Sequence, residues 1–220
     1  MKQTILIDSA TTPDGGEMSL HSHGDDYSIR INGRELMSSR QHNSEQILAE
    51  VVCKKYHKQA INVLVGGLGF GYTLKTVMDN IHEKSKVVVV ELMECVIKWN
   101  TDPELSLGCT EISDARVKTV QADVGKVISD SKNKFDAIIL DVDNGPNAIT
   151  VKSNESLYSR AGLQGIKSAL KPGGTVGIWS AEENQQFEKL LKKCGYKVEV
   201  IKAYSRPNKG SKHTLFIGSL

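Results

Sequence analysis

The sequence predicts an α/β protein built on a Rossmann-like, doubly wound sheet of seven strands, preceded by a small N-terminal β meander. Three observations predict this fold. From residue 60 onward, short apolar runs alternate with amphipathic stretches, which is typical of strands connected by helices. Two of these runs, Val87–Val90 and Ala137–Leu140, are almost uninterrupted, as expected for parallel strands covered on both faces. The chain ends on two strand-like segments with no helix between them, which indicates an antiparallel strand at the end of the sheet.

The first part of the chain, residues 1–43, is expected to form the meander. Short β-like runs lie at Thr4–Ile7, Met18–His23 and Tyr27–Ile31, with turn-forming residues between them. Asn32-Gly33 favours a type I′ turn because both residues tolerate a positive φ. The remaining residues, 44–220, are expected to form one α/β domain.

Within that domain, periodicity and turn residues predict the elements in order. Helices are expected at Glu45–Lys55, Tyr72–Ile81, Met93–Asn100, Val124–Ser129, Leu157–Leu170 and Glu182–Cys194. Strands are expected at Ile61–Val65, Lys86–Leu92, Arg116–Gln121, Phe135–Asp141, Thr175–Ser180, Lys197–Ala203 and Thr214–Ile217. Lys171–Gly174 is expected to form a turn, and Ser205–Lys212 is expected to form a hairpin that joins the last two strands. This succession is the seven-stranded, class I methyltransferase-type variant of the doubly wound sheet.

The composition narrows the class of partner. Hydrophobic residues make up 39% of the chain and charged residues 25%, as in an ordinary soluble protein. There are 28 basic and 26 acidic residues, and a net charge of +2 gives no field that would capture nucleic acid. The start has no signal-peptide pattern, and the longest apolar run is far too short to cross a membrane. We therefore expect a cytoplasmic protein that binds neither nucleic acid nor membranes.

No metal site is predicted. The four cysteines, Cys53, Cys95, Cys109 and Cys194, lack metal-binding spacing and are expected to be free thiols. His21 and His23 would project from the same face of a strand, but no further ligand motif completes a site around them.

A glycine-rich turn is the first candidate binding element. Gly66, Gly67, Gly69 and Gly71 follow a predicted strand and precede a predicted helix. Glycines permit a tight turn and a close approach of the backbone to a ligand. In a doubly wound sheet the ligand lies beyond the carboxyl ends of the strands, where this turn falls. The turn is therefore predicted to contact an adenosyl nucleoside, and the alternative is a turn that only joins strand to helix.

Two acidic residues follow the next two strands. Glu91 ends its strand about 20 residues after the glycines, where a carboxylate accepts hydrogen bonds from ribose hydroxyls. Asp123 would accept a hydrogen bond from the amine of adenine, while Val124 packs on the ring. Each has a structural alternative: Glu91 as a solvated acid, and Asp123 as the N-cap of a helix.

A pair of carboxylates, Asp141 and Asp143, follows a fourth strand in the loop Asp141–Pro146. Two carboxylates crowded at one site raise a pKa toward the range of a general base, and they also suit a cationic amine. The alternative is an Asx-turn, since Asp-Asn-Gly-Pro forms turns readily. Tyr158 and Trp179 are compatible with either a contact to the acceptor or packing in the core.

Together these features resemble the polyamine aminopropyltransferases, typified by spermidine synthase, over nearly the whole chain. The meander, the glycine turn, Glu91, Asp123 and the loop ending in Gly145-Pro146 follow the order of that family, as do two later segments, Glu155–Tyr158 and Lys171–Gly174. The resemblance implies S-adenosylmethionine or its decarboxylated form as co-substrate, a small-molecule amine or other acceptor, and a homodimer. It also implies that Glu91 holds the ribose, Asp123 the adenine and Asp141 the attacking amine, so that Asp141 and Asp143 would be catalytic.

The sequence departs from this family at the positions that hold amines. Phe70 stands where the glycine loop of the family has an aspartate that contacts the aminopropyl ammonium. Leu48 and Ala49 replace a Tyr-His or Tyr-Gln pair, and the loop after Asp141 is two residues shorter than its usual form. These changes keep the adenosyl pocket and remove the family's clamp on the aminopropyl group.

Two further functions therefore remain open beside aminopropyl transfer. One is an S-adenosylmethionine-dependent methyltransferase acting on a small molecule, because the same fold serves both chemistries. Such enzymes often carry an acid just ahead of the glycines of the loop, and Val65 is the residue here. The other is a nucleoside-binding relative without transfer activity.

Overall fold

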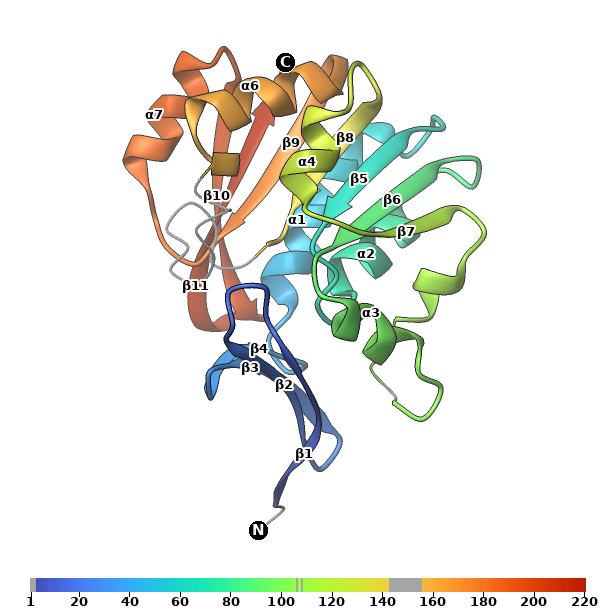
Figure 1. Cartoon of the computed structure of the whole chain (residues 1–220). Coiled ribbons are helices and arrows are strands. Elements are labelled where there is room, and N and C mark those ends of the chain that lie inside the picture. Colours follow the sequence, from blue (N-terminus) through green and yellow to red (C-terminus); the bar gives the residue numbers. More distant parts are fainter. Residues whose placement is uncertain (1–2, 106, 108, 143–155) are drawn as a thin grey trace.

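The computed structural model describes residues 3–105, 107, 109–142 and 156–220 (Figure 1). It contains a four-stranded antiparallel sheet followed by a seven-stranded mixed sheet. The fold class predicted from the sequence is confirmed: an α/β protein with a Rossmann-like sheet and a small N-terminal meander.

The meander consists of four consecutive strands, each paired antiparallel with the next. They are β1 (Thr4–Thr11), β2 (Glu17–His23), β3 (Asp26–Ile31) and β4 (Arg34–Ser38). Asn32 and Gly33 connect β3 to β4 with φ angles of 50° and 77°, as predicted for a hairpin turn of this type.

The large sheet has the strand order β10-β11-β9-β8-β5-β6-β7. Its strands are β5 (Asn62–Gly66), β6 (Lys86–Glu91), β7 (Val117–Gln121), β8 (Phe135–Leu140), β9 (Leu170–Ser180), β10 (Lys197–Arg206) and β11 (Lys209–Ser219). The pairs within β5–β9 are parallel, whereas β11 is antiparallel to both of its neighbours. After β7 the chain returns to the other side of β5, so the topological switch point lies between β5 and β8.

Helices cover both faces of this sheet, as its apolar strands require (Figure 1). On one face are α1 (Asn43–Cys53), α2 (Tyr72–Asn80) and α3 (Glu94–Thr101); on the other are α4 (Val124–Ser129), α6 (Arg160–Ala169) and α7 (Gln185–Lys193). Two short 3₁₀ helices span Lys54–Tyr56 and Thr110–Ser113. Each face has its own apolar core. None of the helices in the described ranges is long and apolar enough to span a bilayer.

One predicted turn is wrong. Lys171–Gly174 belongs to β9, where the pairing with β8 jumps from Phe135–Leu170 to Ala137–Thr175 and leaves the extra residues as a bulge. The hairpin expected at Ser205–Lys212 is present, but its strands are longer than predicted, because β10 and β11 stay paired as far as Arg206 and Lys209. These strand ends are largely polar and exposed, so they lack the apolar pattern that identifies a strand.

The meander packs onto the large sheet. Met18, Leu20 and Ile29 belong to the same buried cluster as residues of α1, α2 and β5. The indole Nε1 of Trp99 on α3 donates a hydrogen bond of 2.8 Å to Asp8 on β1. The division into residues 1–43 and 44–220 stays a proposal, and this shared core implies that the two parts are stable together.

Candidate active site

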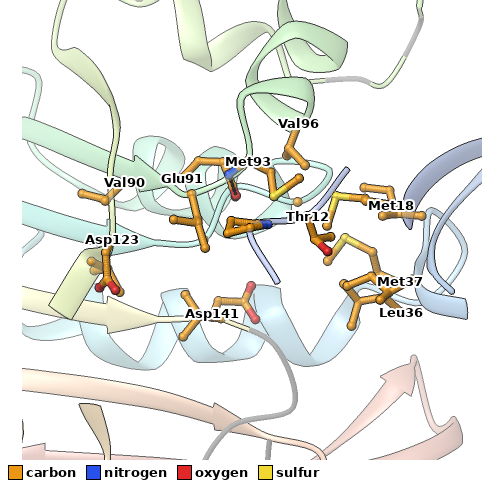
Figure 2. Close-up of a pocket in the computed structure, with 18 of the residues that line it drawn as sticks. Thr12, Met18, Leu36, Met37, Val90, Glu91, Met93, Val96, Asp123 and Asp141 are labelled. Carbon is orange, nitrogen blue, oxygen red and sulfur yellow. Dashed lines mark hydrogen bonds between the residues drawn. The ribbon is translucent and has the colours of Figure 1, made fainter. Parts of the chain in front are cut away.

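A cavity lies between the carboxyl ends of β5, β6 and β8 and the meander (Figure 2). The sheet side contributes Gly67, Gly69, Glu91, Asp123, Val124 and Asp141, and the meander contributes Met18, Ile29, Ile31, Leu36 and Met37. In Figure 2, Asp123 lies at one end, Met18 and Met37 lie at the other, and Glu91 and Asp141 lie between them. The strand ends thus bring together residues far apart in the sequence, at the switch point of the sheet.

The predicted glycine turn forms the floor of this cavity, but its four glycines differ in position. Gly67 and Gly69 line the cavity, whereas Gly66 packs against Val124 and Gly71 against Cys109. Gly67 has a φ of 87°, and a Cβ atom there would collide with the carbonyl oxygen of Asp141. The close packing of two strand ends therefore requires glycine at position 67.

Glu91 is fastened to the turn by its carboxylate. One oxygen, Oε2, accepts a hydrogen bond of 2.9 Å from the backbone N–H of Leu68, and Oε1 accepts one of 2.8 Å from Met93. These two bonds fix the position of the carboxylate on the wall of the cavity.

Asp123 caps a helix and also lines the cavity. Its side chain accepts hydrogen bonds from the backbone N–H groups of Gly125 (2.7 Å) and Lys126 (3.4 Å) at the start of α4. Asp123 is therefore the N-cap of α4, as the structural alternative for this residue predicted. The position on the cavity wall agrees with the ligand-binding alternative, so the two interpretations do not exclude each other.

Asp141 follows β8 directly and is held from two sides. Its backbone N–H donates to the carbonyl of Gly66 at 2.9 Å, and its Oδ2 accepts a 2.6 Å hydrogen bond from the hydroxyl of Thr73. Burial raises the pKa of the Asp141 carboxyl, and the Thr73 hydrogen bond opposes this rise. The second predicted catalytic residue, Asp143, lies outside the described residues.

A second cavity adjoins the first and shares Leu36, Met37 and Asp141 with it. Its other lining residues are Glu35, Ser38, Gln41, Ser44, Glu45, Trp179, Ser211 and His213. Asp141 therefore stands at the junction of the two cavities. The Trp179 ring packs on His213 with 4.6 Å between ring centroids, so Trp179 lines this cavity and is not simply a core residue.

Glu45 is, with Glu35, one of two acidic residues of this cavity that the sequence did not reveal. Burial, and then the negative charge of Asp141, raise the pKa of its carboxyl well above the usual range. In the sequence, Glu45 is an acid in the first turn of a helix, where acids are favoured by the helix dipole alone. Only the tertiary packing of α1 against the end of β8 distinguishes it from an ordinary helix residue.

The residues that replace the family's amine contacts are buried in apolar surroundings. Phe70, Leu48 and Ala49 belong to the core cluster on the α1 and α2 face, and none of them lines either cavity. Tyr158 packs edge-on against Phe187 at 5.8 Å between ring centroids, which favours its packing role.

Acidic side chains dominate the walls of the two cavities. Together they present Glu35, Glu45, Glu91, Asp123 and Asp141, and neither cavity has a lysine or arginine on its wall in the part of the chain that the structure describes. Burial lowers the pKa of His213, so the one imidazole on these walls is kept neutral. The arrangement therefore suits ligands that carry positive charge.

The strand order, the antiparallel β11 and the cavity at the switch point define a methyltransferase-type, Rossmann-like fold. Two solved structures share this fold over 97% of the chain. A spermidine synthase in complex with the transition-state analogue AdoDATO has a TM-score of 0.78 at 21% identity, and the match covers 73% of that protein. The spermidine synthase from Thermotoga maritima has a TM-score of 0.75 at 20% identity and is covered over 72%.

A family model, the spermine/spermidine synthase domain, matches residues 42–205. The chain belongs to this family. Curated relatives are polyamine aminopropyltransferases from Saccharolobus islandicus, with 28% identity in strain L.S.2.15 and 27% in strain Y.N.15.51, each over 136 residues. These matches cover 62% of the chain and 44% of each relative, so the chain spans less than half the length of the curated relatives.

Proposed function

We propose that this protein is a spermidine synthase-like transferase that binds decarboxylated S-adenosylmethionine and transfers its aminopropyl group to a small-molecule amine. One observation carries the proposal: the two joined cavities present five carboxylates and, among the described residues, no lysine or arginine. Both substrates of such a reaction are cations, so this lining complements them.

The first cavity would hold the nucleoside. Glu91 would accept hydrogen bonds from the ribose hydroxyls, because its carboxylate is held on the cavity wall by the backbone of Leu68 and Met93. Asp123 would accept from the amine of adenine, and Val124 would pack on the ring. Gly67 and Gly69 allow the backbone to approach the ligand closely.

The same lining favours the decarboxylated co-substrate. The carboxylate of S-adenosylmethionine would enter a cavity in which, among the described residues, no lysine or arginine pairs with it. The Asp141 carboxylate would also repel it. An unpaired buried charge costs several kcal/mol. Decarboxylation removes this cost and leaves an ammonium and a sulfonium, which favours aminopropyl over methyl transfer.

The second cavity would hold the acceptor, with Asp141 as general base. The acceptor ammonium gives a proton to the Asp141 carboxylate, and the free amine attacks the carbon next to sulfur. As the new C–N bond forms, the C–S bond breaks and its electron pair passes to sulfur, which leaves as a neutral thioether. Because the leaving group is a sulfonium, no acid is required to assist it, and positioning supplies the rest of the catalysis. Asp143 remains a proposed catalytic residue beside Asp141.

The test is product formation. The protein is incubated with decarboxylated S-adenosylmethionine and a panel of di- and polyamines, and 5′-methylthioadenosine is detected by mass spectrometry. We expect this product with at least one amine; its absence across the panel would overturn the proposal. Enzyme-dependent methyl transfer from S-adenosylmethionine to any cell-extract component would instead support the methyltransferase alternative.

We also propose that the protein is a homodimer formed through the meander. The first strand, β1, is an edge strand on which Ile5, Leu6 and Ile7 are 55%, 56% and 39% exposed. Exposed apolar residues on an edge strand favour association. Light scattering tests this: a dimer that becomes a monomer on Leu6→Lys supports the proposal, and a monomeric wild type contradicts it.

A further inference from the structure

The second cavity brings two carboxylates to one small space. Glu45 comes from the first turn of α1 and Asp141 from the end of β8, and both side chains line the cavity. Other titratable groups around them are Glu35 on β4, Tyr72 on α2 and His213 on β11. Among the described residues, none of these neighbours supplies a positive charge that would neutralise the pair.

The surroundings decide which carboxylate is charged in the empty cavity. Two like charges in a poorly solvated space do not both ionise near neutral pH. Asp141 accepts a short hydrogen bond of 2.6 Å from Thr73, whereas Glu45 accepts one from its own backbone N–H and a long one of 3.3 Å from Ser44. Hydrogen bonds to the ionised form favour it, so Asp141 carries the charge. Burial and this charge together raise the pKa of Glu45.

We propose that Glu45 is a second catalytic-site carboxylate of the acceptor cavity, which holds a proton while the cavity is empty and releases it to solvent when an ammonium group binds between Glu45 and Asp141. The inference rests on the proposed function, because it takes the acceptor to be an amine. The step is a simple exchange: a carboxylic acid and an ammonium become an ion pair, and one proton leaves.

This exchange explains how one cavity serves both binding and deprotonation. An ammonium offers three N–H donors and one positive charge, so it compensates both carboxylates at once. When Asp141 later takes a proton from the nitrogen, the amine becomes neutral, and the ionised Glu45 balances the positive charge that the nitrogen regains as the new C–N bond forms. Glu45 is held in place by a chain of contacts, since the Trp179 indole donates to the Ser44 hydroxyl at 3.0 Å and Ser44 donates to Glu45.

The experiment is calorimetry of putrescine binding to the full chain saturated with 5′-methylthioadenosine, near neutral pH. Titrations in two buffers with different ionisation enthalpies give the number of protons released. We expect the wild type to release about one proton per bound amine. Glu45→Gln should bind putrescine more weakly and release almost none. Glu45→Asp should restore part of the release, and Glu50→Gln, an exposed position on the same helix, should behave as the wild type.

The outcomes separate this inference from the function on which it rests. Putrescine binding with a heat that does not depend on the buffer overturns the role of Glu45 and leaves the amine site intact. Undiminished proton release in Glu45→Gln also overturns it, because another group must then be the source. If neither putrescine nor any other amine of the panel binds, and no 5′-methylthioadenosine forms, the proposed function itself fails.

Discussion

Asp123 combines a structural and a proposed ligand-binding role in one carboxylate, and two substitutions separate them. Asp123→Ala removes the cap of α4 and should cost about 1 kcal/mol of stability. Asp123→Ser keeps a good cap and should retain most of that stability, yet it loses the charged acceptor for adenine and should weaken 5′-methylthioadenosine binding roughly tenfold. Denaturation and calorimetry measure the two effects. If the serine variant binds as tightly as the wild type, Asp123 is a cap alone.

Asp141 carries the proposed proton transfer. Asp141→Asn keeps the shape of the side chain and removes the base, so the turnover rate should fall about 100- to 10,000-fold. Binding of 5′-methylthioadenosine should change little, because the nucleoside contacts are assigned to Glu91 and Asp123. Asp130→Asn, at an exposed position after α4, is the matched control. A turnover rate of Asp141→Asn equal to that of the wild type would contradict the assignment of Asp141 as the base.

Glu45 should also affect how the stability of the folded protein depends on pH. Because its pKa in the folded protein is raised, its favourable contribution is complete at acid pH and is lost as the pH rises through the raised value. Glu45→Gln removes this titration, so the variant should gain melting temperature over the wild type progressively from acid to alkaline pH. Thermal melts across that range measure the difference. A difference that stays constant with pH would show that Glu45 ionises as an ordinary glutamate.

At the scale of elements, the alternation of strands and helices was predictable because each element has its own period of apolar residues. The turn at Gly66–Gly71 and the acids after β6, β7 and β8 were also predictable, since strand ends of a doubly wound sheet meet at one edge. Glu45 was not, because its role depends on how α1 packs against β8. The start of β9 and the polar ends of β10 and β11 were missed because pairing, not apolar pattern, holds them in the sheet.

The junction between the glycine turn and β4 is a second element that can be tested. Gly69 has a φ of 51°, and a Cβ atom there would lie 2.6 Å from the Cε of Met37. Gly69→Ala should therefore cost about 1–2 kcal/mol and also weaken 5′-methylthioadenosine binding, because Met37 lines both cavities.

The matched control is Gly173→Ala, which shares a positive φ of 75° but has open space around the added atom. It should show a similar loss of stability in denaturation and no change in nucleoside affinity by calorimetry. Equal affinity in the two variants would contradict the claim that the turn and Met37 together shape the cavity.

At the scale of the whole molecule, the meander and the large sheet form one binding unit. The sheet provides the acids and glycines of the first cavity, and the meander provides its apolar wall. The two cavities meet at Leu36, Met37 and Asp141, where the transferred group would pass from nucleoside to acceptor. The proposed chemistry depends on one property of this path, the acidic character of the side chains that line it.

The most direct test of that property is calorimetry of the wild-type protein with decarboxylated S-adenosylmethionine, S-adenosylmethionine and 5′-methylthioadenosine. Among the described residues, no lysine or arginine on the cavity walls can pair with a carboxylate. The decarboxylated form should therefore bind at least tenfold more tightly than S-adenosylmethionine. Binding of 5′-methylthioadenosine measures the nucleoside contacts alone. Tighter binding of S-adenosylmethionine than of its decarboxylated form would contradict the account and point to methyl transfer.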